Sequence, residues 1–108
     1  KLRALAVSSA TPLASMSELP TIAVAGAMPD FEAIQWYGIV APARTPATVV
    51  TLLNGEINLA LASPALRSRL DADGAEAAPG TPAAFGALIA SEIARWKPVI
   101  EQSNMKPD

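Results

Sequence analysis

The chain has 108 residues, a formal net charge of −2 and a sequence pI near 5.0, and it contains neither histidine nor cysteine. This length fits one domain at most, and the eight Lys and Arg residues are scattered, which excludes a basic surface for nucleic acid. Without cysteine there are no disulfides or thiolate metal sites, and without histidine the commonest general base and metal ligand are missing; we therefore expect no enzyme, no metal and no cofactor.

The first part of the chain predicts a strand followed by one turn of helix. Residues 2–9 carry apolar side chains on both faces, as a buried parallel strand does. The Thr, Pro and Ser content of residues 10–16 marks a loop. Residues 19–21 then begin a single helical turn that ends at Gly26, and residues 27–30 form a turn.

A second strand and three helices follow. Residues 36–40 have the aromatic and β-branched content of a strand, and Pro42 ends it. Each helix begins where a hydroxyl side chain caps the first turn and a proline at the first helical position loses no hydrogen bond. These helix starts are Thr45-Pro46, Ser63-Pro64 and Thr81-Pro82.

The helices differ in length and in their apolar faces. The first presents a stripe with a period near 3.6, made by Val49, Val50, Leu53, Ile57, Ala60 and Leu61. The second runs from Pro64 to about Asp73 and stops at Gly74. The third is the longest and places Phe85, Leu88, Ile89, Ile93, Trp96 and Ile100 on one side, with Glu92 and Arg95 opposite. Pro98 predicts a kink in the third helix. Residues 75–78, between the second and third helices, are predicted to form a short edge strand.

The ordered set of motifs resembles the Bug-type solute-binding receptors of tripartite tricarboxylate transporters. The resemblance covers the apolar start, the Pro-Thr-Ile segment at 20–22, the Trp-Tyr-Gly-Ile-Val-Ala-Pro run at 36–42 and the Glu-Ile-x-x-Trp pattern at 92–96. No single motif is specific, but their order is. One departure is Val24, which stands where relatives are expected to have Glu.

The resemblance implies an α/β fold, namely the C-terminal part of a type II periplasmic binding protein with two to three strands and three main helices. Residues 1–108 are then a C-terminal fragment of a two-lobed receptor. Within it, residues 1–35 form a hinge and strand region, and residues 36–108 form a strand and helices that return to one lobe.

Four residues are candidates for ligand binding. Ser8 and Ser9 close the first strand, and ligands of open α/β sheets bind at the carboxyl ends of strands; the plainer reading is that both hydroxyls satisfy the loop backbone. Trp36 and Tyr37 begin the second strand, where each ring either lines the cleft between the lobes or packs in the core. Residues 31–32 border the same cleft in this interpretation.

The function implied by the resemblance is capture of a small organic acid, a carboxylate or an amidated relative, for a tripartite tricarboxylate transporter. The partners are then the solute, bound poorly by this chain alone, and the membrane subunits of the transporter; the location is the periplasm. The alternative is a self-associating α/β interaction domain without a ligand, which forms a homodimer through exposed sheet edges.

Overall fold

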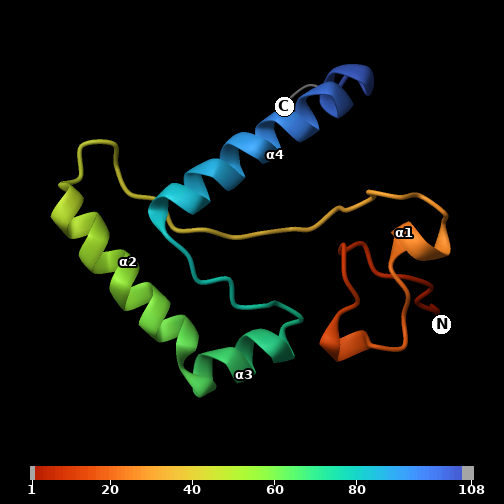
Figure 1. The fold of residues 1–108 in the computed structure, drawn as a ribbon, viewed down its shortest axis with the longest axis horizontal. Helices are drawn as coiled ribbons and strands as arrows, with labels where there is room; N and C mark the ends of the chain where they lie inside the picture. Colours follow the sequence, from red (N-terminus) through yellow and green to blue (C-terminus); the bar gives the residue numbers. More distant parts are fainter. Residues whose placement is uncertain (1, 106–108) are drawn as a thin grey trace. The chain divides into compact units, whose positions relative to one another are not determined.

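A computed structural model describes residues 2–105 of the chain. They belong to two compact units, Lys1–Gly38 (unit 1) and Ile39–Asp108 (unit 2). Unit 1 holds the 3₁₀ turn η1 (Ala14–Met16) and the short helix α1 (Ile22–Ala25). Unit 2 holds the helices α2 (Ala47–Ala62), α3 (Pro64–Ala72) and α4 (Pro82–Gln102) (Figure 1).

Unit 1 is organised around one parallel bridge between Val7 and Thr21. The Val7 N–H donates to the Pro20 carbonyl at 2.9 Å, and the Ile22 N–H donates to the Val7 carbonyl at 2.8 Å. Val7 and Thr21, 8% and 3% exposed, are the buried residues of the described part of the chain. Because two hydrogen bonds flank this buried pair, the bridge fixes where α1 starts.

The helical turn predicted after residues 19–21 is confirmed as α1. The Thr21 hydroxyl caps it by accepting a hydrogen bond from the Val24 N–H at 3.3 Å. Gly26 is the C-cap, but the residue in the left-handed conformation is Ala27, with φ +48°. The Met28 N–H reaches back to the Ala23 carbonyl at 3.1 Å, which closes the helix as a Schellman motif with alanine in the position that glycine usually occupies.

The three long helices were predicted correctly, and two of the three predicted caps are confirmed. The Ser63 hydroxyl accepts from the Leu66 N–H at 3.4 Å, and the Thr81 hydroxyl accepts from the Ala84 N–H at 3.1 Å. At α2 the prediction was wrong, because the N-cap residue is Pro46, without a side-chain cap. The Thr45 N–H instead donates to the Pro42 carbonyl at 2.9 Å in the preceding turn.

Helix α3 ends as predicted, just before Gly74, which follows the C-cap residue Asp73. The φ of Gly74 is +72°, a left-handed conformation that favours glycine. The Ala75 N–H donates to the Leu70 carbonyl at 2.9 Å, and the Gly74 N–H donates to the Asp71 carbonyl at 3.1 Å, the two bonds of a Schellman motif. This turn directs residues 75–80 away from α3.

Two asparagines of α2 hold the segment that leads into α4. The Asn58 amide makes two hydrogen bonds to the Gly80 backbone, accepting from its N–H at 3.1 Å and donating to its carbonyl at 3.0 Å. The Asn54 amide also donates to the Gly80 carbonyl, at 2.8 Å. We call this the asparagine clamp. It ties α2 to the residue before the Thr81 cap and so fixes the start of α4.

The clamp changes which face of α2 is packed. The partly buried residues of this helix are Val50, Asn54, Ile57, Asn58 and Leu61. The predicted stripe was therefore only half right, since Val49 and Leu53 remain 41% and 49% exposed. Two polar residues occupy the packed face because the Gly80 backbone there needs hydrogen-bond partners.

In α4, the prediction that Glu92 and Arg95 lie opposite the apolar side was wrong. Both are partly buried, with side chains 15% and 35% exposed, whereas Ile93 is 64% exposed. Glu92 lies seven residues after Phe85 and four before Trp96, which places all three on one face of a helix with 3.6 residues per turn. Its carboxylate accepts a hydrogen bond from the Trp96 Nε1–H at 3.0 Å and pairs with the Arg95 guanidinium at 3.5 Å.

The predicted α/β fold with two to three strands is wrong for this structure. Residues 2–105 contain no strand, only the isolated bridge of unit 1, and the predicted strands at 2–9, 36–40 and 75–78 are extended or irregular. A strand needs a neighbour to complete its hydrogen-bond ladder, and no second extended segment pairs with these three beyond one residue.

Pro98 lies inside α4 as expected. The kink expected at Pro98 stays a prediction.

Replacing Asn58 with Ala removes two of the three clamp hydrogen bonds. A net hydrogen bond contributes about 0.5–1.5 kcal/mol, and exposed bonds such as these contribute less than buried ones. We therefore expect the free energy of unfolding of unit 2 to fall by about 1–2 kcal/mol. Urea unfolding followed by far-ultraviolet circular dichroism measures this free energy. Gln102→Ala is the matched control, and an equal loss in both variants would contradict the clamp.

Replacing Ala27 with Gly relieves a left-handed alanine, so this substitution stabilises unit 1 by about 0.5–1 kcal/mol. Slower hydrogen exchange of the Val7 and Ile22 amides, read by NMR, reports the gain. Ala25→Gly is the control, because Ala25 is helical and glycine there costs stability. If Ala27→Gly speeds exchange as Ala25→Gly does, the conformation assigned to Ala27 is incorrect.

Candidate functional site

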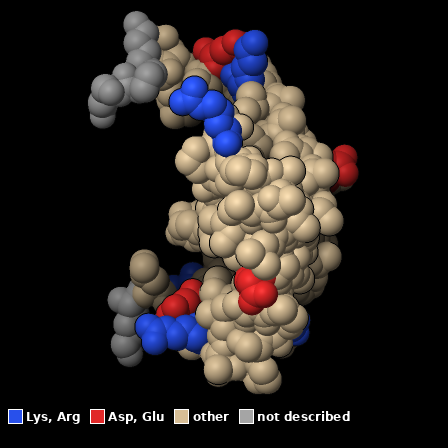
Figure 2. Space-filling view, turned by 90° about the vertical axis from the view of Figure 1, so that its left-hand side faces the viewer, with Lys and Arg blue, Asp and Glu red and all other residues tan. Residues whose placement is uncertain are grey.

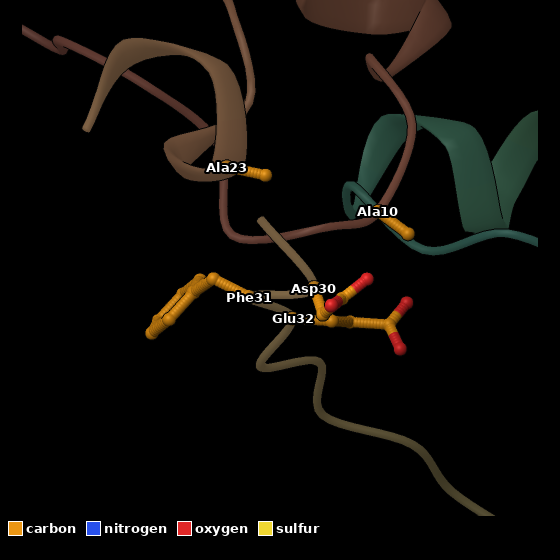
Figure 3. A pocket seen from close by; sticks show the side chains of 5 residues that line it. All are labelled: Ala10, Ala23, Asp30, Phe31 and Glu32. Carbon is orange, nitrogen blue, oxygen red and sulfur yellow. The ribbon is translucent and has the colours of Figure 1, made fainter. Parts of the chain in front are cut away.

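The candidate site is an open pocket in unit 1 with a volume of about 310 Å³. Its walls are Ala10, Ala23, Asp30, Phe31 and Glu32 (Figure 3). Ala10 follows the segment of the Val7–Thr21 bridge, and Ala23 belongs to α1. Asp30 ends the turn after α1, and Phe31 and Glu32 follow it. The pocket therefore draws on three stretches of one unit.

Backbone hydrogen bonds hold these stretches together. The Ala33 N–H donates to the Ser8 carbonyl at 2.9 Å, which ties the end of the 30–33 stretch to the residues just before Ala10. The Phe31 N–H donates to the Met28 carbonyl at 3.1 Å. Asp30, in the turn thus formed, has a φ of +67°, a conformation that aspartate tolerates better than most residues. The shape of the pocket is thus set by main-chain bonds.

The predicted site residues Ser8 and Ser9 lie beside the pocket without lining it. The Ser8 carbonyl accepts the Ala33 hydrogen bond, and the Ser9 hydroxyl donates to the Thr11 carbonyl at 2.6 Å. For Ser9 this is the plainer reading made from the sequence, in which the hydroxyl satisfies the loop backbone. A role of either serine in binding stays a prediction.

Trp36 and Tyr37 lie outside the pocket as well. Tyr37 is 84% exposed, and its hydroxyl accepts a hydrogen bond from the Gln35 side-chain amide at 2.8 Å. Trp36 is 36% exposed. Neither ring is packed in a core, and their predicted position at the start of a strand was wrong, so ligand contact by these two residues also stays a prediction.

The chemistry of the pocket is that of a hydrogen-bond acceptor. In Figure 3 the carboxylates of Asp30 and Glu32 extend to the same side, and the Phe31 ring extends to the other. None of the five lining residues is Lys or Arg. The Asp30 carboxylate attracts N–H donors and repels a negatively charged group, so its side of the pocket suits a neutral amide or an amine better than a bare carboxylate.

Sequence reasoning named Phe31 and Glu32 as bordering a cleft between the lobes, and both line this pocket. It did not name Asp30. The signal for Asp30 was its place after Pro29 at the end of a predicted turn, where aspartate is common and adopts left-handed conformations. Within residues 2–105 no group of three or more acidic side chains is placed to hold a metal ion.

Tested by length and hydropathy, no single helix within residues 2–105 could cross a membrane, although α2 and α3 together meet the criterion as a pair bent by 72°.

Comparison with known proteins identifies the family. Residues 1–105 match the family described as the tripartite tricarboxylate transporter family receptor. The chain is 41% identical over 100 residues, 93% of its length and 30% of the relative, to a protein of Pseudomonas sp. strain P51 named "UPF0065 protein in tcbD-tcbE intergenic region". It is 39% identical over 100 residues to the "UPF0065 protein in clcB-clcD intergenic region" of Pseudomonas knackmussii, covering 93% of the chain and 59% of that relative.

A third relative is "Protein BugT" of Bordetella pertussis, which is 37% identical over 105 residues, 97% of the chain and 32% of BugT. The chain thus spans less than two thirds of each of these three relatives. No solved structure matches it significantly. A family match over nearly all 108 residues confirms the resemblance seen in the sequence motifs: this chain belongs to the tripartite tricarboxylate transporter receptor family.

Proposed function

We propose that this chain is part of a periplasmic receptor that captures a small organic acid and delivers it to the membrane subunits of a tripartite tricarboxylate transporter. The observation that carries the proposal is the family match over residues 1–105. The relation to BugT, whose name marks it as a Bug protein, supports the same role. The family is described as one of receptors, which agrees with a chain that has no His or Cys for catalysis.

Within this role, the pocket of unit 1 forms one wall of the solute site. The Asp30 carboxylate of its wall disfavours a second negative charge. The solute therefore turns its uncharged or amidated end toward Asp30, while the rest of the receptor binds its carboxylate. This orientation favours monoamides over dicarboxylates.

A self-associating domain without a ligand is the second candidate. The sheet edges that motivated it do not occur among residues 2–105. Its remaining support is the large number of exposed apolar side chains, such as Leu52, Leu59 and Ile93.

The proposal predicts a preference for amides in a complete receptor. We suggest a chimera in which this chain replaces the matching segment of BugT, titrated by calorimetry with succinate and with its monoamide, succinamate. We expect succinamate to bind more tightly, and Asp30→Asn to narrow the difference by about three- to tenfold, the effect of one charge a few ångströms away in a partly solvated site. Glu18→Gln, an exposed carboxylate of unit 1 outside the pocket, is the control.

Two results would count against the proposal. If the folded chimera binds no organic acid or amide, the receptor role is wrong. If it binds both solutes but Asp30→Asn behaves like Glu18→Gln, the receptor role stands and the pocket is not the wall of the site.

A further inference from the structure

The asparagine clamp contains a sequence that is prone to a covalent change. Asn54 is followed directly by Gly55, and the side-chain amide of an asparagine can be attacked by the backbone nitrogen of the next residue. A glycine in that position speeds the attack, because it has no Cβ to keep the two groups apart. The other two asparagines of the chain, Asn58 and Asn104, are followed by a leucine and a methionine, whose side chains hinder the same step. Asn54 therefore has the sequence context that best favours the reaction.

The reaction is deamidation, and its one other reactant is water. Base removes the proton of the Gly55 N–H, and the nitrogen forms a bond to Cγ of Asn54. The Cγ–Nδ2 bond then breaks, and the side-chain nitrogen takes up a proton and leaves as ammonia, so that a five-membered succinimide ring remains. Water opens this ring at either carbonyl, which gives aspartate or isoaspartate at position 54. The net change is the loss of ammonia and the gain of water, without oxidation or reduction.

The folded structure opposes this reaction at three points. Within α2 each N–H is held by the carbonyl four residues earlier, so the Gly55 N–H is not free to lose its proton. A helical ψ of about −42° also turns the Gly55 nitrogen away from the Asn54 side chain. The nitrogen that must leave, Asn54 Nδ2, donates to the Gly80 carbonyl at 2.8 Å. Deamidation thus requires that this turn of α2 and the clamp open together.

The protection is limited, because little else holds this part of α2 closed. None of the residues of α2, all of which the structure describes, is buried, and the clamp bonds to Gly80 are exposed. Glycine in the interior of a helix weakens it relative to alanine. Packing does not require a glycine here, since within the described part of the chain a Cβ on Gly55 would meet nothing within 4 Å. Gly55 therefore both permits the attack and favours the local opening that the attack needs.

We propose that Asn54 is a deamidation site which the asparagine clamp protects, and that its conversion weakens the clamp irreversibly. The carboxylate of the product has no N–H to donate to the Gly80 carbonyl, and its negative charge faces the carbonyl oxygen instead. Isoaspartate also adds a methylene group to the main chain, which interrupts the hydrogen bonds of α2. Gly80 then keeps only its two bonds to Asn58. This inference does not depend on the proposed function.

The product differs from the original chain by a charge on a surface that has few charges. Figure 2 views the molecule from the side on which α2 lies in Figure 1 and shows mostly uncharged side chains there. Glu56 is the single charged residue of this helix. Deamidation adds a second negative charge to α2, so anion exchange separates the product from the unmodified chain.

Incubation of the purified chain in mildly alkaline buffer tests the proposal, with tandem mass spectrometry to measure deamidation at each asparagine. In the urea-unfolded chain we expect Asn54 to react first. In the folded chain its rate should be lower by on the order of a hundredfold, because the reaction follows the population of the opened state. Asn58→Ala removes two of the three clamp bonds and should raise the rate at Asn54 in the folded chain by roughly fivefold to thirtyfold.

Two further variants are controls. Gln102→Ala, outside the clamp, should leave the rate at Asn54 unchanged. Gly55→Ala should suppress the reaction in the folded and in the urea-unfolded chain, because the added Cβ hinders the attack without clashing in the described structure.

Three results would overturn the proposal. If Asn54 reacts equally fast in the folded and the unfolded chain, the fold does not protect it. If Asn58 or Asn104 reacts first in the unfolded chain, the site is wrongly assigned. If the rate at Asn54 is the same in a folded Asn58→Ala variant, the helix alone protects this residue and the clamp has no part in it.

If Asn58→Ala does not fold, the unsubstituted chain provides the same test as urea is added below the unfolding transition. The rate at Asn54 and hydrogen exchange of the Gly80 amide should then rise in parallel, because both require the clamp to open. A rise of one without the other overturns the proposal.

The effect on the clamp is measured on the product itself, collected by anion exchange. We expect faster hydrogen exchange of the Gly80 amide and a lower urea midpoint than in unmodified chain incubated alongside. Asn54→Asp reports the effect of the carboxylate without the added methylene group, and its loss should be smaller than that of the isoaspartate product. A product with the exchange rate and the midpoint of the unmodified chain would show that the modification does not weaken the clamp.

Discussion

Unit 2 depends on one exchange of hydrogen bonds between an asparagine side chain and a glycine backbone. Asn58 mimics a peptide group, donating to and accepting from Gly80, which is 22 residues away in the chain. Without it, the segment after α3 would have no fixed path, because residues 75–79 form no regular structure. The Thr81 cap and the whole of α4 follow from where Gly80 is held, so a polar contact, and no apolar core, sets the arrangement of these helices.

Unit 1 follows the same logic on a smaller scale. Its Val7–Thr21 bridge and the Ala33–Ser8 hydrogen bond bring three stretches together around a pocket with two carboxylates. Main-chain bonds position this wall. In the proposed receptor, this chain contributes a scaffold and one wall of the solute site.

Local signals in the sequence predicted the helices well and the strands badly. Hydroxyl–proline pairs and Gly74 act within a few residues, so Ser63, Thr81 and the end of α3 could be read directly. Strands need a neighbouring strand that local composition does not supply. The aromatic and β-branched content of residues 36–40 therefore led to a wrong prediction of a strand. The family resemblance was confirmed, but it carried an α/β fold that residues 2–105 do not show.

Polar residues on helix faces account for the other errors. Asn54, Asn58 and Glu92 were assigned no packing role, yet each is partly buried because a hydrogen-bond partner lies on that face. In the pocket, residues 31–32 were named from the sequence as bordering a cleft because they precede the aromatic pair. Asp30 depends on a turn conformation that its sequence neighbours favour without requiring it.

Hydrogen exchange at the Gly80 amide tests the central claim most directly. Gly80 lies in an irregular segment, where an amide would ordinarily exchange as fast as that of its neighbour Ala78, for which no hydrogen bond is seen. The account predicts that the Gly80 N–H, which donates to the side-chain Oδ1 of Asn58, exchanges markedly more slowly than the Ala78 N–H. Equal exchange of the two amides would mean that the clamp does not form in solution, and the arrangement of α2 and α4 described above would be incorrect.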